Sequence, residues 1–153
     1  MRLLLLAAIA PLPALAQGLL IPPVKLLDTA HEARDQTADH ARRLALMGDV
    51  LAQALSGEQV DAASIAAACP SETADCLVTF LRQRGGERGL FVAVQKSSTL
   101  ILQVFATLVD LPARQVIARR ELNFRGDNDE SWRRAALFLA REFADGTGRA
   151  PAR

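Results

Sequence analysis

The sequence predicts an α+β domain whose mixed sheet of four or five strands ends in a three-strand antiparallel meander, with helices packed against it. Three observations lead to this fold class. The first half of the chain holds stretches with helical spacing of apolar residues, residues 90–124 hold three strand-like segments joined by short turns, and an amphipathic stripe follows. Because the chain has 153 residues, we expect one domain over residues 17–145, followed by a flexible tail over 146–153.

Residues 1–16 have the features of a secretory signal peptide. Met1 and Arg2 form a short basic start, an apolar run follows to Ala10, and Ala14 and Ala16 occupy the two positions that a signal peptidase recognises. The prolines at positions 11 and 13 interrupt the run, which disfavours a transmembrane anchor. We therefore expect export through the Sec pathway, cleavage before Gln17, a periplasmic location and no membrane-spanning segment in the mature chain.

The first strand is predicted over Leu19 to Leu27, and Pro22-Pro23 within it favours an edge position or a bulge near the start of the strand. A helix follows over Asp39 to Leu55 and ends before Gly57, and Gln59 to Asp61 is a candidate for a very short strand. Two shorter helices are predicted over Ala62 to Ala68 and Thr73 to Arg84. The preference for right-handed crossovers leads us to expect the early helices on the same face of the sheet.

The meander is predicted over Leu90 to Gln95, Thr99 to Asp110 and Gln115 to Phe124. The middle strand alternates apolar residues on one face, and its other face is only partly polar, so we expect both faces to be covered to some degree. Asp127 and Glu130 fit a capping box that opens the last helix. The predicted inward residues are Leu100, Leu102, Val104, Ala106 and Leu108 on the middle strand, Val116, Ala118, Leu122 and Phe124 on the third, and Trp132, Ala135, Ala136, Leu139 and Phe143 on the helix.

The two cysteines, Cys69 and Cys76, have six residues between them. An oxidising compartment favours a structural disulfide between them. Two free buried thiols are the main alternative. A redox or metal site is disfavoured because the pair is not a Cys-x-x-Cys motif at a helix start.

Charge and composition disfavour nucleic acid as a partner. The formal net charge is +1, and the chain has one Trp and no Tyr, so it offers neither a large basic excess nor a set of stacking platforms. Residues 17–81 carry four basic and nine acidic side chains, whereas residues 82–153 carry thirteen and eight. The two halves either intermix in the folded domain or give a dipolar surface that docks electrostatically on a partner.

No motif in the sequence predicts catalysis, a metal site or a cofactor. The only histidines, His31 and His40, lack the spacing of a metalloprotease helix, and we expect both to be solvated near a helix start. The acidic run from Asp127 to Glu130 lacks the glycine and the final glutamate of an EF-hand loop, so helix capping explains it better.

Two segments carry a resemblance to a known family. Val94 to Leu102 and Arg125 to Arg134 resemble the signature of a secreted bacterial family known as domain of unknown function 2380, and the likeness extends over residues 88–143 and more weakly over 19–80. More remotely, the order of elements is similar to that of the N-terminal domain of TolB and related envelope proteins. The Asp-Thr-Gly turn usual in those domains is replaced here by Asp110 followed by Pro112-Ala113-Arg114. The resemblance implies the fold and an envelope setting, and it brings no catalytic residue.

These observations favour a non-enzymatic interaction module of the bacterial cell envelope, with an envelope protein as partner and self-association as a further possibility. The alternatives are a periplasmic small-ligand binding protein and an enzyme of unknown class. One candidate surface is the edge strand Leu19 to Leu27. The other is a charged cluster that the meander gathers at one end of the sheet, namely Lys96, Arg125, Asp127, Asn128, Asp129 and Glu130.

Overall fold

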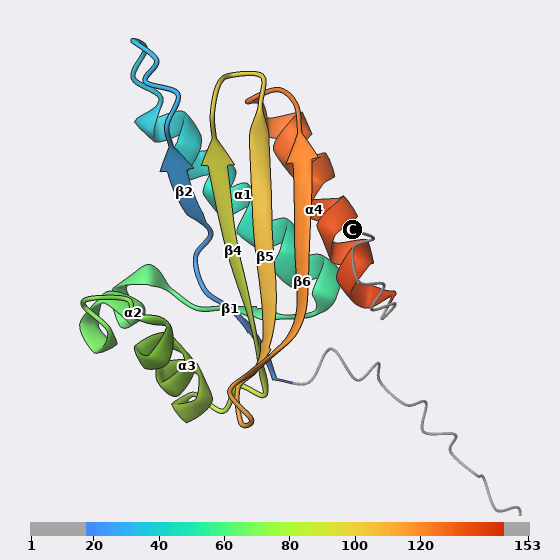
Figure 1. Ribbon diagram of the computed structural model, residues 1–153. Coiled ribbons are helices and arrows are strands. Elements are labelled where there is room, and N and C mark those ends of the chain that lie inside the picture. The colour runs from blue at the N-terminus through green and yellow to red at the C-terminus, as the bar shows by residue number, and fades with distance from the viewer. Residues whose placement is uncertain (1–17, 146–153) are drawn as a thin grey trace, which may run out of the picture.

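The structure is a computed structural model that describes residues 18–145 (Figure 1). The protein forms a mixed six-stranded sheet with the strand order β3-β1-β4-β5-β6, and β2 also pairs with β4. The predicted α+β class is confirmed, including the antiparallel meander of β4, β5 and β6. The elements are β1 (Leu19–Ile21), β2 (Lys25–Asp28), α1 (Thr37–Leu55), β3 (Glu58–Gln59), α2 (Ala62–Ala68), α3 (Ala74–Gln83), β4 (Arg88–Lys96), β5 (Leu102–Asp110), β6 (Gln115–Phe124) and α4 (Asp129–Ala144).

The first predicted strand is divided into β1 and β2 at Pro22-Pro23. A proline offers no amide hydrogen to a neighbouring strand, so two in succession break the ladder. Both pieces run parallel to β4, and β1 is also paired with β3 on its other side. The edge position predicted for this strand therefore applies to β2, for which β4 is the only paired strand within residues 18–145.

The main core lies between one face of the sheet and the helices α1 and α4, which lie side by side behind the strands in Figure 1. The sole tryptophan, Trp132, is completely buried there, and its ring meets Phe124 edge to face with the ring centres 5.8 Å apart. All five inward residues predicted for the last helix are buried. Aromatic pairs of this geometry add about 1 kcal/mol to the stability that comes from burying their surface.

The shorter helices α2 and α3 pack on the opposite face, so the prediction that the early helices share a face is wrong. Leu81 of α3 and Ile65 of α2 form a second core with Leu20, whereas the neighbouring Leu19 and Ile21 point into the main core. The strand order explains the difference. The chain passes from β1 outward to β3 and then returns across β1 to β4. Two right-handed crossovers that run in opposite directions place their helices on opposite faces.

Two inward residues predicted in the meander lie on the surface. Leu100 belongs to the hairpin turn before β5 and is 67% exposed. Val116 is exposed because the pairing of β5 with β6 shifts register between Leu108 and Val109. This shift turns the side chains at the start of β6 to the opposite face of the sheet. The face that carries α2 and α3 is covered only at one end of the sheet, and Phe105 remains 40% exposed on it.

Cys69 and Cys76 form the predicted disulfide, which joins the end of α2 to the first turn of α3. Replacing both cysteines with serine should lower the free energy of unfolding by about 2 to 3 kcal/mol, because the short cross-link restricts the unfolded chain. Urea unfolding of both proteins under oxidising conditions measures this change. A difference below about 0.5 kcal/mol would contradict the expectation.

The predicted signal peptide and the predicted tail lie outside the described residues. Within residues 18–145, no helix has the length and apolar character needed to cross a membrane.

Candidate functional site

Two residues of the predicted charged cluster meet inside the protein. The Nζ atom of Lys96, the last residue of β4, lies 2.9 Å from Oδ2 of Asp127, which precedes α4. Both side chains have no exposed surface. The structure thus brings these two residues together as predicted, but their charges are paired internally and neither is available to a partner.

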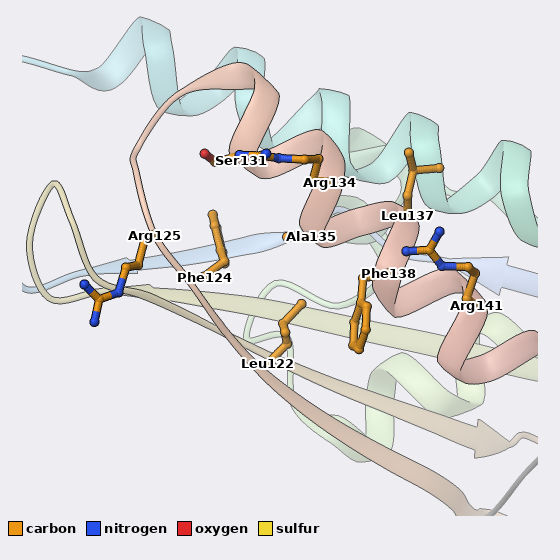
Figure 2. A pocket seen from close by; sticks show the side chains of 9 residues that line it. All are labelled: Leu122, Phe124, Arg125, Ser131, Arg134, Ala135, Leu137, Phe138 and Arg141. Atoms are coloured by element: carbon orange, nitrogen blue, oxygen red, sulfur yellow. The ribbon is translucent and has the colours of Figure 1, made fainter.

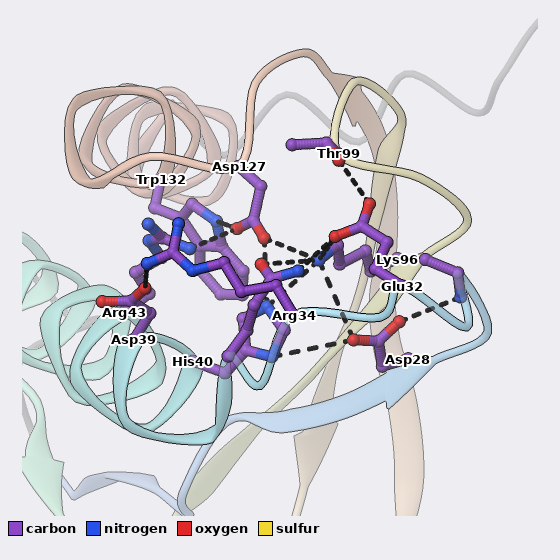
Figure 3. A network of polar contacts seen from close by, with 12 residues as sticks. Asp28, Glu32, Arg34, Asp39, His40, Arg43, Lys96, Thr99, Asp127 and Trp132 are labelled. Atoms are coloured by element: carbon purple, nitrogen blue, oxygen red, sulfur yellow. Dashed lines mark hydrogen bonds and ion pairs between the residues drawn. The ribbon is translucent and has the colours of Figure 1, made fainter.

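The Asp127 carboxylate is the centre of this buried network (Figure 3). Its Oδ1 accepts hydrogen bonds from Arg43 Nη1 and from Trp132 Nε1, both at 2.9 Å. Its Oδ2 is contacted by Lys96 and by His40 Nε2, the latter at 3.0 Å. Four donors therefore occupy the approximately four acceptor positions of the carboxylate. Asp127 ties both helices of the main core to the end of β4.

The Lys96 ammonium group is surrounded by acceptors from the loop that precedes α1. It donates to Glu32 Oε2 at 3.1 Å and to Gln36 Oε1 at 3.0 Å, and Asp28 Oδ2 lies 3.9 Å away. Glu32 also accepts a hydrogen bond from Thr99 in the hairpin turn. The network therefore fastens the loop over residues 29–36 to the end of the sheet.

The remaining residues of the predicted cluster lie on the surface. Asp129 forms ion pairs with Arg42 and Arg43 of α1, and Glu130 lies 3.7 Å from Arg134. Asn128 caps α4 by accepting a hydrogen bond from the amide of Ser131. The prediction that Asp127 opens this helix as its cap is therefore wrong by one residue, because the Asp127 side chain turns inward to the network.

Burial and hydrogen bonding act in opposite directions on the titration of these groups. Burial raises the pKa of Asp127, but hydrogen bonds from Lys96, His40 and Trp132 outweigh it and lower that pKa from 3.8 to about 2. Burial also lowers the pKa of Lys96, whereas its bonds to Asp127 and Glu32 raise it, with a net increase above 10.5. The pair is thus held in its charged form.

This arrangement of charged groups is better suited to stabilising the fold than to catalysing a reaction. A protonated lysine is no nucleophile, and a carboxylate with four donors has no free position from which to accept a proton. Within residues 18–145, every buried side-chain nitrogen or oxygen has a hydrogen-bond partner. The same part of the chain holds no group of three or more His, Cys, Asp or Glu residues arranged to bind a metal ion.

The shifted pKa of Asp127 makes stability depend on acidity. Because the folded pKa lies below the unfolded one, the contribution of this carboxylate is complete above pH about 4 and disappears as the pH falls to about 2. The expected loss is roughly 2 kcal/mol. Fluorescence of Trp132, which donates to this carboxylate, would follow acid unfolding, and Asp127→Asn should lack this part of the pH dependence. An Asp127→Asn variant with the same pH dependence as the parent would contradict the expectation.

His40 and Arg43 were not among the predicted site residues, although the sequence carries signals for both. His40 was expected to be solvated, but it is buried beside Asp127, whereas His31 is exposed as expected. His40 and Arg43 lie seven and four residues before Met47, on the apolar stripe of α1. Lys96 likewise continues the inward alternation of Leu90, Val92 and Val94. Polar residues in the middle of an apolar stripe indicate buried partners.

A separate feature is a groove of about 610 Å³ between β6 and α4 (Figure 2). Leu122 and Phe124 of β6 and Phe138 of α4 point toward one another in it. Phe138 is 44% exposed and Leu137 is 42% exposed, so apolar surface of α4 is left uncovered here. The lining is completed by Arg125, Ser131, Arg134, Ala135 and Arg141.

The charged residues that line the groove are all arginines. Arg125 has no ion-pair partner within the described residues, Arg141 lies over the ring of Phe138, and Arg134 has only the distant contact with Glu130. Arg125 is thus the one member of the predicted cluster that lines the groove. An apolar floor with a positive rim is suited to a ligand that is apolar and acidic.

Comparisons with solved structures find neighbours of low sequence identity, and the likeness to TolB shows a shared fold. TolB from Acinetobacter baumannii is 14% identical with a TM-score of 0.53 over 92% of this chain, which spans 30% of TolB. The C-terminal domain of LpoB from Salmonella enterica is 12% identical, with a TM-score of 0.48 over 71% of this chain and 82% of that domain. A lipoprotein from Neisseria meningitidis is 14% identical, with a TM-score of 0.48 over 86% of this chain and 98% of its own.

Comparison of the sequence with known protein families identifies the family of this chain. No curated protein matches the sequence. The family described as "Protein of unknown function (DUF2380)" matches residues 20–143, which include all the strands and helices from β2 to α3, the meander and most of α4. The resemblance inferred from Val94 to Leu102 and Arg125 to Arg134 is confirmed, and the chain belongs to this family.

Proposed function

We propose that this protein is a secreted, periplasmic interaction module of the bacterial cell envelope, without enzymatic activity, which docks on a protein partner through β6 and α4. The observation that carries the proposal is an edge of β6 that has no strand partner within residues 18–145, beside an apolar, arginine-lined groove. A sheet edge supplies backbone hydrogen-bonding groups, and an adjacent apolar groove supplies binding energy.

Secretion is supported by the signal-like sequence of residues 1–16 and by the Cys69–Cys76 disulfide, a bond favoured in oxidising compartments. The exported protein should begin at Gln17 and weigh two hydrogen atoms less than its reduced form. Intact-mass measurement on periplasmic protein tests both points. Retention of residues 1–16, or two thiols that alkylate without reductant, would contradict this part of the proposal.

The β6 edge is better suited to docking than the edge of β2. β6 has ten residues, whereas β2 has four and follows the two prolines. Lys25 of β2 forms an ion pair with Glu72 at 2.6 Å, and Asp28 faces the buried network. Short, charged and proline-flanked strands are typical of edges that proteins protect from pairing.

The absence of enzymatic activity is supported by the closed geometry of the buried network. Its shifted pKa values arise from ion pairs that are completed within the protein, and such pairs shift pKa values without any catalytic role. Among the described residues that line the groove, only arginines have titratable side chains, and these offer no general acid or base near neutral pH.

Site-specific photocrosslinking in the periplasm tests the docking surface. A photoreactive amino acid would replace Leu137 in the groove and, as matched controls, the exposed aliphatic residues Leu27 on β2 and Leu100 in the hairpin turn. We expect one defined envelope protein to crosslink from position 137 and neither control to yield it.

The outcomes separate the candidate surfaces. Crosslinks from Leu27 alone would move the interface to β2, and crosslinks from Leu100 alone would move it to the β4–β5 turn. The absence of any protein adduct at position 137 in correctly exported protein would overturn the proposal. Adducts of small molecules alone would instead favour the ligand-binding alternative, since the groove volume lies within the range of ligand pockets.

A further inference from the structure

We infer that the partner presents an extended acidic segment that adds as a strand to the C-terminal half of β6 and places alternate apolar side chains in the groove against α4. This inference rests on the proposed function and specifies the chemistry of the partner. It follows from the position of the groove relative to the free edge and from the charges on the groove rim.

The two halves of β6 differ in how freely they can pair. The register shift opposite Leu108 and Val109 distorts the first half, between Val116 and Ala118, and the charged residues Arg119, Arg120 and Glu121 follow in the middle of the strand. From Glu121 to Phe124 the pairing with β5 is regular. A bulge discourages the addition of a strand, and the register shift lies in the first half, so the second half is the more favourable position.

The groove lies where the side chains of an added strand would point. Leu122 and Phe124 project from β6 on the face that α4 covers, and α4 contributes Leu137 and Phe138 to the same groove (Figure 2). A strand paired to β6 would lie about 4.8 Å beyond it and direct every second side chain to this face. Apolar residues at those positions would cover the exposed surface of Phe138.

The groove rim determines the charge of the segment. Arg134 and Arg141 are seven residues apart on α4, a rise of about 10.5 Å, which equals the length of about three extended residues. Carboxylates spaced two to four residues apart in the segment can therefore approach both. Arg125 extends the positive rim beyond the end of β6. Arginine pairs with carboxylates through two parallel hydrogen bonds, which favours an acidic segment over a neutral one.

The same charges disfavour two other occupants. A second copy of this chain paired through β6 would bring two arginine-lined grooves together, which like-charge repulsion opposes. The segment over residues 146–153 contains Arg149 and Arg153 and no acidic side chain, so its charge has the same sign as the groove.

The test uses the mature protein and a nine-residue peptide, Leu-Thr-Glu-Thr-Leu-Thr-Glu-Thr-Leu, in an NMR titration. We expect binding that weakens with added salt and shifts the signals of β6 and α4. The double variant R134E/R141E should bind the peptide at least about tenfold more weakly. R133E is the matched control, because Arg133 is exposed on the same helix outside the groove, and we expect it to change the affinity less than about twofold.

Three further peptides test the mode of binding, namely a lysine version and two N-methylated versions, one for each strand edge. A version with lysine in place of glutamate should not bind, because its charge matches that of the rim. Each of the two other versions carries N-methyl groups on the amides of one strand edge. The version whose methylated edge faces β6 should lose binding, because methylation removes the amide hydrogens needed for backbone pairing. Retained binding of the N-methylated peptides for both edges would overturn strand addition, and equal binding of the acidic and lysine peptides would overturn the acidic partner.

The remaining outcomes separate this inference from the proposed function. If no acidic peptide binds but position 137 still crosslinks to an envelope protein, the inference is wrong and the proposed function stands. Binding to phosphatidylglycerol vesicles in place of the peptide would show a membrane surface as the occupant. Sedimentation experiments could instead reveal a dimer that persists in R134E/R141E and that crosslinks from position 137. Such a dimer would show that the occupant of the groove is a second copy of this chain. Either result overturns the inference.

Discussion

Lys96→Met should lower the free energy of unfolding by about 3 to 5 kcal/mol, which corresponds to a fall in melting temperature of about 10 to 20 °C. The ammonium group is fully buried and lies within 3.1 Å of Asp127 and Glu32. Methionine fills much of the same volume but leaves these acidic groups without their shared cation. Removing one partner of a buried ion pair is costly because the other charge stays buried.

Urea and thermal unfolding of Lys96→Met beside Arg125→Met would measure this effect. Arg125 lies at the neighbouring junction but is exposed and has no ion-pair partner within the described residues, so its replacement should change stability by less than about 0.5 kcal/mol. A loss below about 1 kcal/mol for Lys96→Met would show that the network contributes little to stability. If Lys96 and Arg125 acted only as a docking surface, neither replacement would change the melting temperature much.

Asp127→Ala should also destabilise the protein by about 3 to 5 kcal/mol. The substitution removes the acceptor of Lys96 and Arg43, and it leaves Trp132 Nε1 without its hydrogen bond in the core. As a helix cap, Asp127 would have contributed only about 1 kcal/mol, a value that now applies to Asn128→Ala. Urea unfolding of both variants separates the two roles. Equal losses for Asp127→Ala and Asn128→Ala would contradict the assignment of Asp127 to the network.

A double-mutant cycle would measure the coupling between these residues directly. The double variant of Lys96→Met and Asp127→Ala removes both charges, so its stability loss should be smaller than the sum of the single losses by at least about 1 kcal/mol. Additive losses would show that the two side chains act independently despite the 2.9 Å contact.

The sequence predicts the elements best where local patterns and packing agree. The helix α2 and the strand β6 have the predicted limits, and α4 buries its whole predicted stripe. The predictions that were wrong depend on long-range contacts. The opposite placement of α1 and α2 depends on the strand order, and the exposure of Val116 depends on a register shift between two strands. Neither is encoded in a local pattern.

The candidate sites follow the same rule. Both Lys96 and Asp127 were chosen from the sequence because turns and junctions of the meander gather at one end of the sheet, and the structure does bring them together. Their burial was not predicted, because it requires His40 and Arg43 of α1, which is distant in sequence. The groove between β6 and α4 could be predicted only in part, since Leu137 and Phe138 stand outside the apolar stripe but their neighbours on β6 depend on the packing.

Amide hydrogen exchange of the mature protein, measured by NMR with and without the acidic peptide, tests strand addition at β6 most directly. If a strand adds to this edge, outward amides within residues 120–125 become hydrogen-bonded, and their exchange should slow at least about tenfold at saturating peptide. The amides of β2 and of the hairpin turn should exchange as before. Protection confined to Lys25–Asp28 or to the turn between β4 and β5, or no protection at saturation, would contradict the account.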